Sequence, residues 1–219
     1  MGGNKALKLW PCAAPSGPIP LFARAALTLE SFCSRVEVAT GEGQPPTEIA
    51  TSAWGTFPDA RPAGWPEDSP VNAGPLAGLV AALERAAELN LAGVAVLACD
   101  MPLVEPEDFE PLIQSLEKGA DAAMWTVPGD GETCQDQPLV AVYGVKTCAA
   151  ARAALDSGAR RLVAIADVCA AHGRHLAVER VIATENYSRR LVNVNTPYDY
   201  HGAAAAYRLP TPTNRGEGR

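Results

Sequence analysis

The stretch Val94–Pro102 (VAVLACDMP) constrains the fold of this chain more than any other part. It begins with a continuous apolar run, rich in β-branched residues and too short to cross a membrane. Such a run is typical of a strand covered on both faces, as in a parallel sheet beneath helices. It ends at Asp100, at the end of the strand where open α/β sheets bind ligands. A carboxylate there indicates a Mg²⁺ site, or else a cap on the next turn.

The composition favours one folded domain. The chain has 219 residues, of which 47% are hydrophobic and 20% charged, so it can bury a normal core. We expect a single domain over residues 1–208 and a disordered tail over 209–219. The net charge of −7 argues against binding to nucleic acid.

The cysteines and the N-terminus bear on the compartment. Six cysteines are scattered without a C-x-x-C pair, so neither a disulfide framework nor a zinc site is indicated. The chain begins with no basic segment leading into an apolar run, and it contains no membrane-length segment. We therefore expect a cytoplasmic protein without a membrane partner.

Apolar periodicity and turn residues predict alternating helices and strands, which favours an α/β fold with a mostly parallel sheet. Helices are expected over 20–32, 74–89, 105–118, 149–155, 162–171 and 197–207. Besides the central run, strands are expected over 35–39, 49–53, 120–127, 139–143 and 175–181. A polar loop is expected over 129–137, and residues 41–73 are otherwise expected to be irregular.

Three further short motifs contain candidate ligand-binding residues. Gly2, Gly3 and Lys5 form a glycine-rich start that could approach phosphate groups, although Lys5 could also be a solvated terminal charge. Gly74 and Gly78, at the start of a predicted helix, leave room for a ligand or for a packed strand.

The third motif is Asn193–Asp199. Thr196 and Pro197 are typical of a helix start. Asn193 and Asn195 precede them, and loop asparagines often do no more than satisfy backbone groups.

In this order, the motifs resemble the molybdenum cofactor guanylyltransferases and related nucleotidyltransferases. The matching pieces are Gly2–Lys5, Glu67–Ser69, Gly74–Gly78, Ala98–Pro102, Gln137–Tyr143 and Asn193–Asp199. The resemblance covers roughly residues 1–202 and implies a Rossmann-like three-layer nucleotidyltransferase fold.

The chain departs from the family pattern at its start. The family signature reads Leu-Ala-Gly-Gly, three variable residues, Arg-Met-Gly and then the lysine, and Met1 matches its methionine. The absent part would supply the first strand, normally central in the sheet, and most phosphate-binding amides. We therefore expect that an internal methionine was taken as the start, or that the gene is truncated. The neighbours of that strand would then lack ladder partners.

The resemblance implies a role for each matching residue. Lys5 contacts the nucleotide phosphates together with Gly2 and Gly3, and Asp100 ligates Mg²⁺. The remaining assignments are Gly74 and Gly78 at the base and ribose, Asp68 at the base, and Asn193 and Asn195 near the metal and the molybdopterin phosphate.

The implied reaction is attack of the molybdopterin phosphate on the α-phosphorus of GTP, with release of pyrophosphate. The nucleophile is already anionic, so alignment and charge neutralisation suffice without a general base. The implied partners are GTP, molybdopterin, and molybdoenzymes or their chaperones in transient contact. The alternatives are a relative that uses CTP or a sugar-phosphate acceptor, and an inactive nucleotide-binding remnant.

Other residues that could carry chemistry have simpler explanations. His172 and His175 lack a further metal ligand nearby in the sequence, and Cys99 lies within an apolar strand. Arg160 and Arg161 could grip a phosphate, but a solvated face is the simpler expectation. Three tryptophans could line a pterin pocket, but packing is the more ordinary role: Trp54, Trp65 and Trp125.

Overall fold

The computed structural model describes residues 4–11, 17–41, 45–66, 74–129, 133–162, 165 and 176–208. The expected tail and most of the helix expected over 162–171 lie outside these ranges. None of the described helices is both long and apolar enough to cross a membrane.

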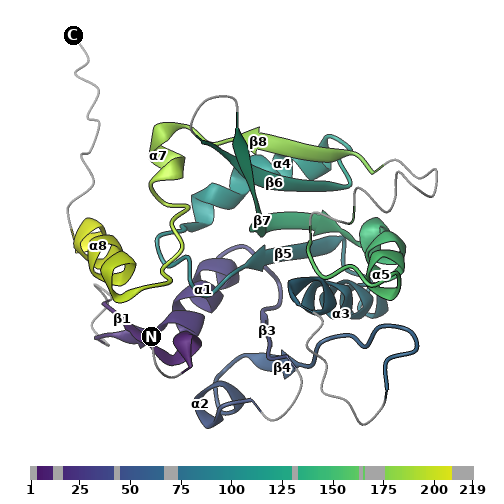
Figure 1. Cartoon of the computed structure of the whole chain (residues 1–219), viewed down its shortest axis with the longest axis horizontal. Coiled ribbons are helices and arrows are strands. Elements are labelled where there is room, and N and C mark those ends of the chain that lie inside the picture. Colours follow the sequence, from purple (N-terminus) through teal and green to yellow (C-terminus); the bar gives the residue numbers. More distant parts are fainter. Residues whose placement is uncertain are drawn as a thin grey trace.

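A four-stranded sheet forms the centre of the molecule (Figure 1). Its order is β5 (Gly93–Leu97), β7 (Cys134–Gly144), β6 (Ala122–Pro128) and β8 (Val178–Ile182). β7 is antiparallel to both β5 and β6, and β6 is parallel to β8. The α/β class is confirmed, but the sheet is mixed and not mostly parallel. The short connection from β6 to β7 allows only a hairpin, because a parallel crossover needs a dozen or more residues.

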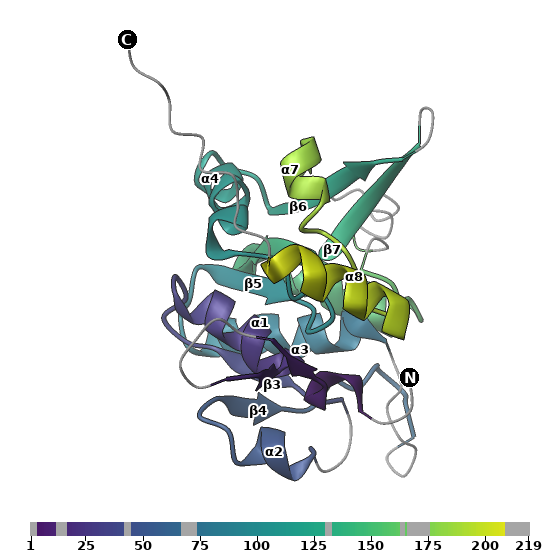
Figure 2. The ribbon, with the colours of Figure 1, turned by 90° about the vertical axis from the view of Figure 1, so that its left-hand side faces the viewer.

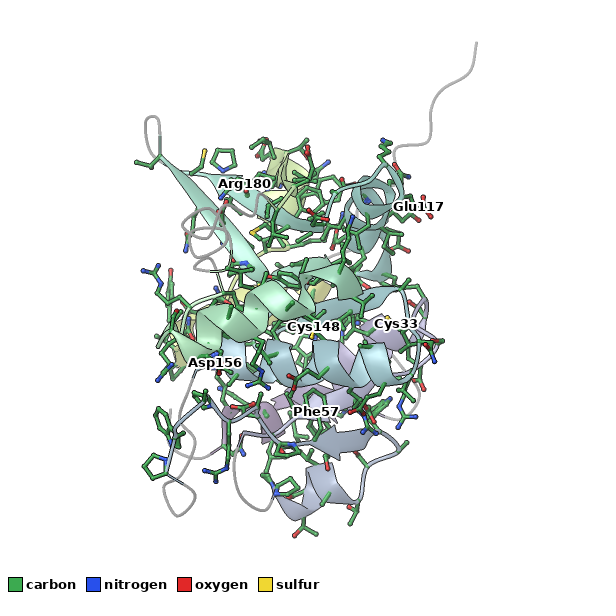
Figure 3. The ribbon with its side chains drawn as sticks, turned by 90° about the vertical axis from the view of Figure 1, so that its right-hand side faces the viewer. Cys33, Phe57, Glu117, Cys148, Asp156 and Arg180 are labelled. Carbon is green, nitrogen blue, oxygen red and sulfur yellow. The ribbon has the colours of Figure 1, made fainter. Side chains whose placement is uncertain are left out.

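Helices cover both faces of this sheet and complete three layers. On one face lie α3 (Pro75–Glu88) and α5 (Cys148–Asp156), which follows the 3₁₀ turn η3 (Val145–Thr147). Figure 3 shows this face, with α5 between the labelled Cys148 and Asp156. On the other face lie η2 (Pro106–Phe109) and α4 (Glu110–Glu117).

β5 contributes side chains to both cores. Val94 and Val96 pack into the core beneath α3 and α5, whereas Ala95 and Leu97 pack into the core beneath α4. This double coverage explains why its sequence is continuously apolar and does not alternate.

The N-terminal segment forms smaller elements beside the sheet (Figure 2). The helix expected over 20–32 is α1 (Leu21–Glu30), preceded by η1 (Lys5–Leu7) and the antiparallel pair β1 (Leu9–Trp10) and β2 (Ile19–Pro20). The strand expected near 35–39 is β3 (Glu37–Ala39), and it pairs in parallel with β4 (Gly55–Phe57).

Two local predictions were wrong. The strand expected over 49–53 is not formed, because Thr47–Ala50 is the short helix α2, anchored by the buried Ile49. The polar loop expected over 129–137 ends early, because β7 already begins at Cys134. The start of β7 is exposed, so it needs no apolar residues to remain paired with β6.

The C-terminal elements are α7 (Glu185–Ser188) and α8 (Pro197–Arg208), and α8 agrees with the helix expected over 197–207. α8 packs on the N-terminal segment: the fully buried Trp10 ring lies 5.6 Å from the Tyr200 ring and 5.7 Å from the Tyr207 ring. The Tyr200 hydroxyl also donates a hydrogen bond to the Leu9 carbonyl. These contacts bring the two ends of the described chain together beside β5.

Candidate functional site

Asp100 lies just beyond the carboxyl end of β5, in a turn held by backbone hydrogen bonds. The Met101 N–H donates to the Ala98 carbonyl (3.2 Å), and the Val194 N–H donates to the Asp100 carbonyl (2.7 Å). The second bond ties the segment before α8 to this end of the sheet. The Asp100 side chain is 23% exposed, so its carboxylate can still meet a ligand.

Lys5 joins Asp100 to a third segment of the chain. Its Nζ donates to Asp100 Oδ2 (2.7 Å) and to Asn195 Oδ1 (2.6 Å), and its side chain is 28% exposed. These residues are 95 and 190 positions away from Lys5 in the sequence. The Lys5 ammonium and the side-chain oxygens of Asp100 and Asn195, which the sequence analysis took from separate motifs, therefore form one cluster.

Asp199 in the first turn of α8 orients the Asn195 loop. Its Oδ2 accepts from the backbone N–H groups of Asn195 (3.1 Å) and Thr196 (2.7 Å). The Thr196 hydroxyl accepts in return from the Asp199 N–H (3.1 Å), which forms a capping box. The side-chain hydrogen bond with Thr196, followed by the backbone hydrogen bond from Thr196, lowers the pKa of Asp199. The Asp199 carboxylate therefore remains ionised at neutral pH.

A cavity of about 1210 Å³ begins at this cluster, and its lining includes Asp100, Gly74 and Gly78. Gly74 has φ +73°, and a Cβ there would lie 2.9 Å from the Arg160 carbonyl oxygen. Gly74 is therefore required for the approach of the Arg160 segment, so packing accounts for this glycine. A Cβ on Gly78 would lie 3.2 Å from Asp59 Oδ1, inside the cavity.

Asp59 is a candidate site residue that the sequence did not single out. It is half-buried, lines the cavity, and has its pKa raised by burial. It follows β4, whose residues are mostly exposed and show no apolar alternation, so nothing in the sequence marks it. The one feature of the sequence that could indicate Asp59 is that an acidic residue precedes Gly74. Asp68 has this feature too, so it does not separate the two residues.

Not every expected site residue can be placed in this cluster. Gly2, Gly3 and Asp68 lie outside the described residues. Asn193 is half-buried, and no hydrogen bond between described residues links its side chain to Lys5 or Asp100.

The residues with simpler explanations mostly pack. The Trp125 indole donates to the Asp108 carbonyl (2.9 Å), and its ring stacks on Tyr187. The Arg160 guanidinium lies over the Trp65 ring, 5.1 Å from its centroid. Burial, and then the charge of Asp100, raise the pKa of the Cys99 thiol, so it remains protonated at neutral pH. His172 and His175 lie outside the described residues.

The Lys5 cluster has donors suited to a hard cation. Asp100 Oδ2 and Asn195 Oδ1 already converge on one positive charge, the Lys5 ammonium. Within the described ranges, no group of three or more His, Cys, Asp or Glu side chains could enclose a metal. Mg²⁺ needs no such cage, because it is commonly held by one or two carboxylates together with substrate phosphates.

The sequence matches one family model and several curated proteins. The family model described as the MobA-like NTP transferase domain matches residues 1–178. A probable molybdenum cofactor guanylyltransferase of Opitutus terrae is 35% identical over 132 residues, which are 60% of this chain and 61% of that protein. A protein of the same name from Chloroflexus aggregans is 30% identical over 196 residues, 90% of this chain and 83% of its own length.

Solved structures agree on the fold. Molybdopterin-guanine dinucleotide biosynthesis protein A of Archaeoglobus fulgidus has a TM-score of 0.62 at 20% identity, covering 94% of this chain and 91% of its own. 2-C-Methyl-D-erythritol 4-phosphate cytidylyltransferase of Thermus thermophilus has a TM-score of 0.63 at 16% identity, covering 95% and 96%. Both support the Rossmann-like nucleotidyltransferase fold.

Proposed function

Because the chain belongs to the MobA-like NTP transferase domain family, we propose that it transfers GMP from GTP to the phosphate of molybdenum-molybdopterin and releases pyrophosphate. The contact of Lys5 with both Asp100, which lines the cavity, and Asn195 supports this function most. It joins a cation for phosphate groups to two oxygen ligands for a metal. The names of the curated relatives support the choice of substrates.

The chemistry asks little of the protein beyond positioning and charge. The acceptor phosphate is anionic at neutral pH, so it can attack the α-phosphorus without a general base. Lys5 neutralises charge on the phosphates, and the cavity aligns the two substrates. Asp100 and Asn195 would hold Mg²⁺, which neutralises charge on the departing pyrophosphate.

Choice of the base is the part of the proposal that concerns Asp59. The guanine edge carries adjacent N–H donors, and a half-buried carboxylate in the cavity can accept from both. Cytosine lacks this pair of adjacent donors, so it would satisfy the half-buried carboxylate less fully than guanine. We assign the contact with the base to Asp59 in place of Asp68, because Asp59 lines the cavity and Asp68 lies outside the described residues.

The test is release of pyrophosphate from GTP, CTP or ATP in the presence of Mg²⁺ and molybdopterin. Asp100→Asn should lower kcat/KM by about 100-fold or more, because it removes a charged metal ligand. The matched control is Asp121→Asn. Asp121 also lies at a strand end, 2.7 Å from a lysine, but its partner is Lys146 at the opposite end of β5.

Asp121→Asn should change turnover by no more than about twofold, because surface ion pairs contribute little beyond the strand end they hold. Equal loss in the two variants, in step with lost stability, would make Asp100 a structural residue. Pyrophosphate release from CTP but not from GTP would refute the guanine assignment while leaving a nucleotidyltransferase.

A further inference from the structure

Two short segments carry the side-chain oxygens that Lys5 contacts. One runs from Asp100 to η2, and the other runs from α7 to Asn195 at the start of α8 (Figure 1). The Val194 N–H, which donates to the Asp100 carbonyl (2.7 Å), is one directed bond between them. The placement of Asn195 relative to Asp100 therefore depends on how the two segments are held against each other.

Apolar packing joins the two segments but does not fix their register. Leu191 lies in one core cluster with Met101 and Val104. Val194 lies in a second cluster with Leu103. Burial of these side chains is favourable but non-directional, so it permits small shifts of one segment along the other. Directed polar contacts are needed to hold the two oxygens in place.

Asp108, in η2, makes such contacts with both segments. Its side chain is only 1% exposed. Oδ2 accepts from the Glu105 N–H (2.9 Å), in the segment that follows Asp100. Oδ1 lies 3.0 Å from a guanidinium nitrogen of Arg190, in the segment that follows α7. One buried carboxylate thus joins the two segments.

Arg190 balances the charge that Asp108 Oδ1 carries. This oxygen accepts no hydrogen bond of good geometry from any residue that the structure describes. Burial raises the pKa of Asp108, and the hydrogen bond from the Glu105 N–H and then the charge of Arg190 oppose that rise. A buried carboxylate without its cation is costly, so the pair restricts where Arg190 can lie.

Aromatic contacts hold the Arg190 guanidinium beside Asp108. It lies over the Tyr187 ring, 5.1 Å from its centroid, and Tyr187 stacks on the buried Trp125 ring (4.5 Å between centroids). The Trp125 indole donates to the Asp108 carbonyl (2.9 Å), which attaches η2 to β6. A planar guanidinium suits both the ring and the carboxylate. The four residues therefore form one closed set of contacts.

We propose that Asp108 and Arg190 are positioning residues for the site, because their ion pair keeps the Asn195 segment in register with Asp100. The pair acts through the backbone of the two segments, so that both side-chain oxygens meet one cation. This inference rests on the proposed function, since the register matters for turnover only if phosphates and a metal bind at Asp100. A merely structural pair would stabilise the fold without tuning the site.

Arg190→Met, Asp108→Asn and the double variant test the proposal. Methionine can still pack on Tyr187 without a charge, and asparagine can still accept from the Glu105 N–H. Arg190→Met leaves a buried carboxylate without its cation, so its thermal midpoint should fall by about 5 °C or more. The double variant removes both charges and should recover part of this loss.

Two readouts report the register. Hydrogen exchange at the Val194 amide should become about tenfold faster in Arg190→Met and in the double variant, relative to the amides of β7, which report global unfolding. KM for the nucleotide should rise about tenfold in both, with kcat within about threefold. The matched control is Arg189→Met, because Arg189 is exposed and pairs with the exposed Glu185. It should change neither readout.

Two results would overturn the proposal. The first is a double variant in which Val194 exchange and KM return towards the parent in step with stability, which would make the pair structural. The second is an equal effect of Arg189→Met, which would assign the change to surface charge. A parent that turns over no nucleotide, while Val194 exchange still responds to Arg190→Met and not to Arg189→Met, would refute the proposed reaction but support the pair's hold on the segment.

Discussion

At the scale of single residues, two lysine–aspartate pairs at opposite ends of β5 show what distinguishes a site from a surface contact. Lys5 with Asp100 and Lys146 with Asp121 have the same separation of 2.7 Å. A hydrogen bond from Lys146 lowers the pKa of Asp121, which also accepts from a backbone N–H and thus holds the start of β8. Both pairs adjoin the cavity, because Asp100 and Lys146 line it, but among the described hydrogen bonds only Lys5 also donates to the side-chain oxygen of Asn195.

Asp59→Asn should increase the stability of the fold and reduce the discrimination between GTP and CTP. Burial raises the pKa of Asp59 in the folded state, so its charged form weakens folding as pH rises from the unfolded pKa through the folded one. The variant should unfold at higher urea than the parent at pH 7, and this difference should vanish below the unfolded pKa of about 4. Its kcat/KM ratio for GTP over CTP should fall about tenfold or more.

Urea unfolding at several pH values and pyrophosphate release with both nucleotides measure these effects. Asp156→Asn is the control, because that carboxylate caps the Ala63 N–H outside the cavity. A lower stability of Asp59→Asn at pH 7, or an unchanged nucleotide ratio, would remove Asp59 from the base site.

The candidate site residues were predictable from the sequence to different degrees. Lys5, Asp100 and Asn195 lie in short motifs whose order is recognisable, so the sequence suggested all three. Asp59 has no such context, because β4 is defined by its pairing with β3 and not by its own pattern. Proximity across 190 positions depends on packing such as that of Trp10, which no local pattern encodes.

At the scale of elements, the start of α8 holds the Asn195 loop. Thr196→Ala removes the hydroxyl of the capping box and should cost about 0.5–2 kcal/mol of unfolding free energy. It should also raise KM more than it lowers kcat, because the loop that carries Asn195 is then held less rigidly. Thr184→Ala is the control, because Thr184 begins α7 without a side-chain cap bond. Equal destabilisation in both variants would contradict the role of the cap.

Gly74 tests how close packing shapes the start of α3. Gly74→Ala should cost about 1–3 kcal/mol, because the positive φ disfavours alanine and the new Cβ meets the Arg160 carbonyl oxygen. Gly64→Ala is matched, since Gly64 has φ +71° with nothing within 4 Å. Thermal unfolding of both variants separates the contact from the backbone effect. If both lose the same stability, the Arg160 contact contributes nothing.

Strong periodicity made some elements predictable. α1, α3 and α8 agree with the sequence within a few residues, because each has a clear apolar face or a clear N-terminal signal. α2 and β4 were missed, because a single anchor such as Ile49 gives no period. The antiparallel course of β7 depends on connection length, and the continuous apolar run of β5 does not reveal it.

At the scale of the whole molecule, the α/β architecture was predictable and the mixed sheet was not. Helices on both faces follow from the alternation of elements along the chain. The meeting of Lys5 and Asn195 beside Asp100 follows from the burial of Trp10 against α8. The chain as a whole has a net charge of −7, so the positive charge of Lys5 can attract a phosphate group only locally.

Binding of Mn²⁺ with a non-hydrolysable GTP analogue, followed by electron paramagnetic resonance, shows whether Asp100 belongs to a metal–nucleotide site. If Asp100 and Lys5 form a metal–nucleotide site, Asp100→Asn should weaken Mn²⁺ binding about 10- to 100-fold in the presence of the analogue. Asp121→Asn should bind Mn²⁺ like the parent. Equal Mn²⁺ affinity in the parent and in folded Asp100→Asn would contradict the claim.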